Sequence, residues 1–226
     1  MLRAVTTALL DALATVLPID CAGCGRPDRA LCDDCRAAIT PLVTPRSVEG
    51  RLTVYTSLRY EGVTRQTLLA LKESGRTDVA KHLAASLAPA ISRALASGAE
   101  VVPVPTSRAA WKRRGYDHVA ILTRRAGFST ARVLVSGKHG AGRKAAQQKS
   151  LGVDQRAANL RHTMVATGPL HGRRFVLVDD VLTSGATLVE AARAITTAGG
   201  EVVGAAALAF TPRLFGAASP SHTRLR

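Results

Sequence analysis

Residues 174–188 read Arg174-Phe175-Val176-Leu177-Val178-Asp179-Asp180-Val181-Leu182-Thr183-Ser184-Gly185-Ala186-Thr187-Leu188. This stretch begins as an apolar run of the kind that a buried parallel strand shows. Two adjacent carboxylates then interrupt the run, at a point where burial without a partner would be costly. Small and hydroxyl residues follow, and after them the apolar side chains fall on one face of a helix. The pattern predicts a strand, an acidic pair, a tight turn and a helix in that order.

This order of elements is typical of an anion site. The N–H groups of the turn and the positive end of the helix dipole would face a phosphate, and Gly185 lets the backbone come close. The acidic pair, Asp179 and Asp180, lies at the carboxyl end of the strand, where open α/β sheets bind ligands. These carboxylates could hold two ribose hydroxyls while the 5′-phosphate lies in the turn. The alternative is a buried strand that ends in a solvated acidic turn.

The stretch from Val176 to Leu188 closely resembles the phosphoribosyl pyrophosphate (PRPP) motif of type I phosphoribosyltransferases. The one departure is Ser184, where threonine is common. The resemblance implies that Asp179 and Asp180 hold the ribose hydroxyls. It also implies that the phosphate is wrapped by Thr183, Ser184, Gly185, Ala186 and Thr187.

Composition narrows the class of protein. The 226 residues suffice for one α/β domain and a small appendage, and a hydrophobic content of 46% supports a sizeable core. Aromatic residues make up only 4%, which argues against a dedicated reader of single-stranded nucleic acid by base stacking. The net charge of +15 favours polyanions or phosphorylated ligands without separating a nucleic-acid surface from a PRPP pocket or a solvated basic face.

The first 18 residues superficially resemble a signal peptide, because Arg3 precedes apolar residues. Asp11 interrupts the apolar stretch, and no run approaches the roughly 20 residues that cross a bilayer. The spacing favours an amphipathic helix that stops at Pro18. We therefore expect no membrane span and a cytoplasmic protein.

All four cysteines lie in two C-x-x-C pairs separated by seven residues: Cys21, Cys24, Cys32 and Cys35. Each pair can present two thiolates, and two such pairs close a tetrahedral zinc site. The prediction is a structural zinc ion held by all four thiolates. Two disulfides are the alternative, although nothing else in the sequence indicates an oxidising compartment.

Between the cysteines and the acidic pair, the pattern predicts a linker followed by alternating strands and helices. The prolines at 41 and 45 suggest a linker over residues 37–50. Further strands are expected over 52–60, 101–105, 131–135 and 201–210, and helices over 63–74, 78–97 and from 119 to about 127. Pro103 and Pro105 place the segment 101–105 at the end of a strand or at a sheet edge.

A basic segment follows the Val101–Pro105 strand, and four of its residues from 108 to 114 are cationic: Arg108, Lys112, Arg113 and Arg114. Beside the acidic pair, these side chains could neutralise a pyrophosphate, with arginine offering forked contacts. A solvated basic helix start is the alternative.

Residues 137–150 are rich in glycine and cations, including Arg143 and Lys144. A loop of this length is more often functional or disordered than inert. It suits a lid that closes over pyrophosphate and excludes water. An ordinary surface loop remains the alternative.

Taken together in their order along the chain, these motifs resemble those of the ComF family, competence-associated proteins related to phosphoribosyltransferases. The resemblance rests on the double C-x-x-C, Tyr60-Glu61-Gly62 to Leu71-Lys72, Val102-Pro103-Val104-Pro105, Arg114-Gly115-Tyr116, Gln148 to Asn159, and the PRPP motif. Asp117-His118 departs from the Asn-Gln common in the family. The family implies a type I phosphoribosyltransferase fold, a parallel sheet flanked by helices. We expect a zinc module over residues 1–45, the transferase-like domain over 46–212, and a flexible tail over 213–226.

The expected chemistry is displacement of magnesium pyrophosphate from the ribose anomeric carbon of PRPP by a nitrogen nucleophile. Asp179, Asp180, Arg108 and Arg114 are the candidate catalytic residues, and Mg²⁺ would accompany PRPP. The sequence names neither the acceptor nor a general base, because Thr183 stands where some relatives carry an acid. The rival hypothesis is a non-catalytic protein that takes part in DNA uptake or binds nucleic acid, single-stranded DNA included, and uses the fold as a nucleotide sensor.

Overall fold

The centre of the computed structural model, which describes residues 19–27, 29–137 and 163–212, is a five-stranded sheet of order β1-β2-β7-β6-β3. Four strands run parallel: β2 (Leu52–Arg59), β3 (Ala99–Pro103), β6 (Arg174–Leu182) and β7 (Glu201–Phe210). β1 (Thr44–Val48) pairs antiparallel with β2 at the edge. This mostly parallel sheet flanked by helices confirms the predicted α/β fold class.

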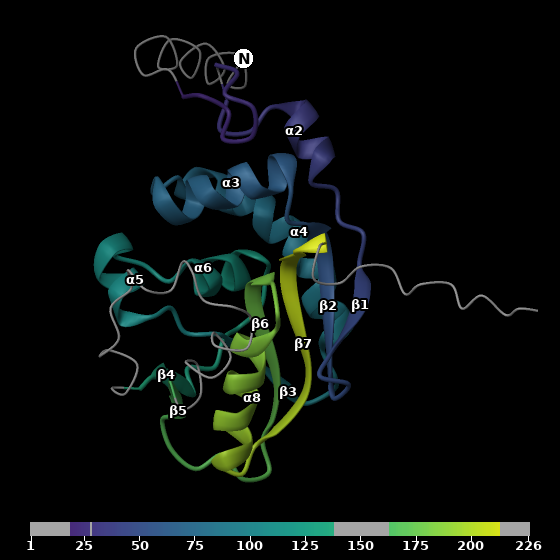
Figure 1. Ribbon diagram of the computed structural model, residues 1–226, viewed down its shortest axis with the longest axis vertical. Helices are drawn as coiled ribbons and strands as arrows, with labels where there is room; N and C mark the ends of the chain where they lie inside the picture. Colours follow the sequence, from purple (N-terminus) through teal and green to yellow (C-terminus); the bar gives the residue numbers. More distant parts are fainter. Residues whose placement is uncertain (1–18, 28, 138–162, 213–226) are drawn as a thin grey trace, which may run out of the picture.

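Helices cover both faces of the sheet (Figure 1). One face carries α3 (Gly62–Glu73), α4 (Ala80–Ala94) and α6 (His118–Arg125), which share a core with the sheet, and the short helix η1 (Thr77–Val79) precedes α4. The other face carries α8 (Ala186–Thr197) and a small sheet of β4 (Leu134–Ser136) and β5 (Met164–Ala166). Burial on both faces explains why β6 and β7 read as continuous apolar runs.

The core of the sheet is built mainly from small aliphatic side chains. β7 contributes the fully buried Ala205, Ala206, Ala207 and Ala209, and β6 contributes Val176, Leu177 and Val178. Phe175 is the largest side chain buried in this part of the sheet. Methyl-sized side chains on a central strand allow the helices above and below to pack close to the sheet.

The predicted linker over residues 37–50 is wrong in part. Its beginning belongs to α2 (Asp33–Ala38), and its end is strand β1. Pro45 is tolerated in β1 because this strand lies at the sheet edge, where a missing N–H costs no ladder hydrogen bond. Pro103 likewise ends the opposite edge strand, β3, as predicted. The strand expected over 131–135 begins only at Leu134 and pairs with β5 outside the main sheet.

The domain boundary between residues 45 and 46 stays a prediction, and β1 crosses it. The predicted N-terminal helix, the lid and the tail over 213–226 fall on residues outside the described ranges, except that residue 137 of the lid is described. Within the described ranges, no helix is both long and apolar enough to span a bilayer.

Candidate active site

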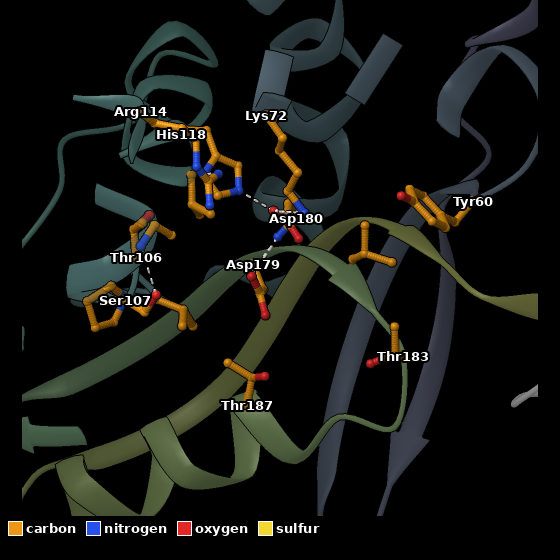
Figure 2. A pocket seen from close by; sticks show the side chains of 15 residues that line it. Tyr60, Lys72, Thr106, Ser107, Arg114, His118, Asp179, Asp180, Thr183 and Thr187 are labelled. Atoms are coloured by element: carbon orange, nitrogen blue, oxygen red, sulfur yellow. Dashed lines mark hydrogen bonds and ion pairs between the residues drawn. The ribbon is translucent and has the colours of Figure 1, made fainter. Parts of the chain in front are cut away.

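A pocket of about 340 Å³ opens at the carboxyl ends of β3 and β6. Its wall is formed by Tyr60, Lys72 and residues from two further regions, 104–119 and 179–187 (Figure 2). The side chains that matter for its chemistry are Tyr60, Lys72, Thr106, Ser107, Arg114, His118, Asp179, Asp180, Thr183 and Thr187. The pocket therefore lies where the sequence placed a ligand site.

The two acids point in different directions. β6 continues through both of them to Leu182, and neighbouring residues on a strand project to opposite faces. In Figure 2, Asp179 points towards Thr187 at the start of α8, whereas Asp180 points towards Lys72 and His118. Asp179 Oδ1 also accepts a hydrogen bond of 2.8 Å from the Asp180 N–H. The acids that the sequence treated as one pair thus occupy two different environments.

Asp180 is held by two cationic or hydrogen-bonding partners from the helical layer. Lys72 Nζ, at the end of α3, lies 2.6 Å from Asp180 Oδ2. His118 Nε2, at the start of α6, contacts the same oxygen. The Asp180 side chain is only 10% exposed, so these contacts compensate for a buried charge.

These environments separate the acidities of the two carboxyl groups. Burial and the neighbouring charge of Asp180 raise the pKa of Asp179 to about 8. Burial also opposes ionisation of Asp180, but the hydrogen bond from His118 and the charge of Lys72 hold its pKa well below the ordinary range. The site thus contains one firmly ionised carboxylate and one carboxyl group that takes up a proton near neutral pH.

The predicted phosphate turn joins β6 to α8, and Gly185 occupies its tightest point. Gly185 adopts a φ of 82°, the left-handed region that favours glycine. A Cβ atom there would lie 2.5 Å from Val48 Cγ1, so the end of β1 packs directly against the turn. Thr183 and Thr187 line the pocket. Ser184, Gly185 and Ala186 form the backbone of the turn between them, where Ser184 Oγ accepts a 3.4 Å hydrogen bond from Ala186 N–H.

The basic segment forms helix α5 (Arg108–Arg114), which presents only part of its charge to the pocket. Ser107 caps it by accepting a 3.3 Å hydrogen bond from Ala110 N–H, and Ser107, Ala110 and Arg114 line the pocket. Arg108, Lys112 and Arg113 are exposed and do not line it. Arg113 Nη2 lies 3.3 Å from Glu73 Oε2 on the surface. Helical periodicity explains the difference, because positions 107, 110 and 114 share one face.

Two polar atoms at this wall are buried and have no hydrogen-bond partner within the described residues: Arg114 Nε and Thr106 Oγ1. Buried polar groups in native proteins are nearly always paired. Both atoms are shielded from solvent, and both belong to residues that line the pocket. Arg114 Nη1 lies 2.9 Å from His118 Nδ1, which fixes the guanidinium beside the acids. The unsatisfied donors suit an anion.

Sequence reasoning missed several of these side chains. In the sequence, Lys72 stands out only as part of the family motif that ends in Leu71-Lys72, and His118 only as a departure from the family pattern. The structure brings both to Asp180 across more than sixty residues of intervening chain, and no local signal carries that information. Asp117 also has a structural role: its Oδ1 caps α6 through Ala120 N–H at 3.0 Å, and its Oδ2 accepts from Thr106 N–H at 3.3 Å. Arg143 and Lys144 of the predicted lid lie outside the described residues.

The four cysteines converge as predicted, with their sulfur atoms all within 4.8 Å of one another. Cys24 Sγ and Cys32 Sγ lie 3.7 Å apart, and all four thiols are free rather than disulfide-bonded. A regular tetrahedron with Zn–S bonds of about 2.3 Å has sulfur–sulfur edges of about 3.8 Å, so this cluster fits zinc. Burial opposes ionisation of Cys21, but backbone N–H donors, including that of Cys32, outweigh it and lower the Cys21 pKa to about 6.

Three comparisons with known proteins were made. A solved structure, orotate phosphoribosyltransferase from Aeropyrum pernix, is 18% identical over 77% of each chain with a TM-score of 0.35, a likeness too weak to carry an argument. A search of curated proteins found no match. The family model of the phosphoribosyl transferase domain matches residues 110–214. The part of the chain that carries Arg114, His118, the acidic pair and the phosphate turn is therefore similar to a phosphoribosyl transferase domain.

Proposed function

We propose that the pocket binds PRPP and transfers its phosphoribosyl group to a nitrogen acceptor, with release of pyrophosphate. One observation carries the proposal. Three kinds of group surround a single cavity: Thr183 and Thr187 at the two ends of the turn, the Asp179 carboxyl group, and the polar side chains of Thr106 and Arg114. These groups match the 5′-phosphate, the ribose hydroxyls and the pyrophosphate of PRPP in kind. The volume falls in the range of about 300–1,000 Å³ usual for small-molecule sites.

Each group binds a different part of PRPP. The turn and the N-terminus of α8 bind the 5′-phosphate. Asp179 faces the cavity and binds the ribose hydroxyls, while Asp180 stays paired with Lys72 and His118. Arg114 and Thr106 offset the charge that pyrophosphate gains when the bond from its oxygen to the anomeric carbon breaks and the electron pair leaves with it. The acceptor nitrogen forms the new bond to that carbon. Arg143 and Lys144 are proposed further contacts to pyrophosphate.

Magnesium accompanies PRPP in this proposal. Mg²⁺ prefers oxygen ligands and keeps several waters, and Asp179 supplies a carboxyl oxygen on the cavity side that suits it. The ion would supply positive charge to the leaving pyrophosphate. Loss of the Asp179 proton, whose pKa is raised, would accompany its binding.

The test is calorimetric titration of PRPP with magnesium, followed by a screen of nitrogen bases for pyrophosphate release. Asp179→Asn should abolish saturable binding. Arg114→Ala should weaken binding by about 10- to 100-fold, since hydrogen bonds from a charged group contribute about 1.5–3 kcal/mol. Arg113→Ala is the matched control, because it removes the same charge one residue away, from a side chain that is 61% exposed and outside the cavity. Equal losses in both arginine variants would refute the assigned geometry.

Membership of the ComF family, a link to DNA uptake, a bound zinc ion and a cytoplasmic location belong to the same proposal. Their support is the motif set described above and the convergence of the four cysteines. Zinc content by elemental analysis of the purified protein tests the metal directly, with one ion per chain expected.

Nucleic-acid binding is a second candidate, favoured by the outer surface of α5. Trp111, the single tryptophan of the chain, is 54% exposed there between the exposed Arg108 and Lys112. An exposed ring flanked by cations can stack on a base while the cations contact phosphates. Quenching of Trp111 fluorescence by a single-stranded oligonucleotide tests this candidate. Binding that is salt-sensitive and survives Asp179→Asn with Asp180→Asn would favour it over the transferase.

A further inference from the structure

One charged side chain of the pocket comes from an element that also supports the four-cysteine cluster. α3 begins beside the cysteines and ends at Asp180, where it supplies Lys72. Figure 1 places α3 between the segment that carries α2 and the part of the molecule that contains α5 and α6. This arrangement connects a predicted metal site to the candidate active site through a single helix.

The first turn of α3 lies directly on the cysteine cluster. A Cβ atom on Gly23, between the first two cysteines, would lie 2.9 Å from Val63 Cγ1 and 2.7 Å from Cys35 Sγ. Cys21, Cys35, Leu68 and Leu71 belong to one buried core. The cluster and the inner face of α3 therefore belong to the same core, and Val63 packs against the loop between Cys21 and Cys24.

The far end of α3 is fixed at three points. Lys72 Nζ contacts Asp180 Oδ2 at 2.6 Å, and the Tyr116 hydroxyl donates to the Leu71 carbonyl two residues before His118. Just beyond the helix, Arg76 Nη1 donates to the Asp20 carbonyl at 3.0 Å, next to Cys21. The last turn of α3 is therefore joined both to the pocket and to the chain that enters the cysteine cluster.

We propose that Lys72 is a positioning residue that fixes Asp180, and that the four-cysteine module (residues 19–39) holds Lys72 in place through α3. A lysine has four flexible carbon atoms, and ordering it costs conformational entropy unless the surrounding structure restrains it. Fixing Asp180 also fixes β6 at the position from which Asp179 faces the cavity. This inference rests on the proposed function only for the choice of ligand.

The test is a double-mutant cycle on the affinity for PRPP with magnesium. Cys24→Ser perturbs the cluster at its exposed member, and Val63→Ala removes the contact to α3 without changing a cysteine. Each should weaken binding about tenfold in the wild-type background and have little effect when Lys72→Met is already present. Lys72→Arg should restore part of the affinity that Lys72→Met loses. The proposal would be overturned if Cys24→Ser and Val63→Ala weakened PRPP binding as much in the Lys72→Met background as in the wild type. It would also be overturned if neither substitution weakened binding in the wild type.

Arg173→Ala is the control for general destabilisation. It breaks an ion pair of 2.8 Å with Glu100 that joins the beginnings of β3 and β6, far from α3 along the strands. Its affinity for PRPP should equal that of the wild type. An equal loss in this variant would mean that the module acts through overall stability, contrary to the proposal.

A second readout separates this inference from the proposed function. The ¹⁵N resonances of the His118 ring report its contact with Asp180, and amide exchange reports the order of residues 62–73. Removal of the metal by a chelator, Cys24→Ser or Val63→Ala should shift the His118 signal and speed exchange in α3. If the wild type does not bind PRPP, the proposed function fails and these two signals alone decide the inference. Unchanged signals in all three cases would refute it.

Discussion

Gly185→Ala tests the packing of the phosphate turn, because two separable costs meet at this residue. The first is conformational: an L-residue at a φ of 82° costs about 1–2 kcal/mol. The second is steric, since the new methyl group would lie 2.5 Å from Val48 Cγ1 and 2.9 Å from Val48 Cγ2. Adding an atom to a packed position costs about 1–3 kcal/mol. We expect the free energy of unfolding to fall by about 2–5 kcal/mol in total.

Gly172→Ala provides the matched control for this prediction. Gly172 has a φ of 73°, and no atom lies within 4 Å of its added Cβ, so only the conformational cost applies. Urea denaturation of both variants at constant pH gives the two free energies, with the slope checked for two-state behaviour. Adding Val48→Ala to Gly185→Ala should recover about 1–3 kcal/mol relative to the sum of the single effects.

Two results would refute the reasoning. Equal destabilisation by Gly185→Ala and Gly172→Ala would mean that Val48 does not press on the turn. If the losses of unfolding free energy in Gly185→Ala and Val48→Ala simply add in the double variant, Val48 likewise does not press on the turn. A turn that moves away from Val48 should also bind the 5′-phosphate more weakly, so Gly185→Ala, but not Gly172→Ala, should weaken PRPP binding in the calorimeter.

Three further predictions follow from charged and metal-binding groups. The pKa of Asp179 is raised to about 8 in the folded protein, so the native state binds more protons than the unfolded state between about pH 4 and 8. The free energy of unfolding should therefore fall as the pH rises through this range. Asp179→Asn should remove this fall, measured as the unfolding free energy at pH 5, 7 and 9; an unchanged pH dependence would exclude the raised pKa. Removal of the metal by a chelator should lower the melting temperature and expose four titratable thiols, whereas a thiol count below four without reductant would favour the disulfide alternative. Glu190→Gln should cost about 1–3 kcal/mol, since this 4% exposed carboxylate pairs with Arg193, whose side chain is 31% exposed, and accepts from Met164 N–H. Faster amide exchange confined to β5 and α8 is expected, and stability within about 0.5 kcal/mol of the wild type, the level of a neutral surface change, would contradict the prediction.

Local sequence patterns predicted most strands of the main sheet and the cysteine cluster. Apolar runs located β6 and β7 within a few residues, because strands buried on both faces need continuous hydrophobic sequence. The segments predicted over 52–60 and 101–105 also match β2 and β3 within a few residues. The spacing of the cysteines predicted their convergence, because each C-x-x-C pair brings its own thiols together. The linker prediction failed at β1, because proline is a poor guide at a sheet edge, where its missing N–H has no consequence.

The strand, the acidic pair and the turn could be predicted from the sequence, since they lie within fifteen consecutive residues and depend on local backbone chemistry. The folded arrangement of the helices was needed to show that Asp180 is bound by Lys72 and His118 while Asp179 faces the cavity. It was also needed to show that Arg114 alone among the four cations of α5 lines the pocket. The physical reason is that a carboxylate takes its charge state from groups within a few ångströms, and those groups come from helices whose positions depend on the packing of the whole core.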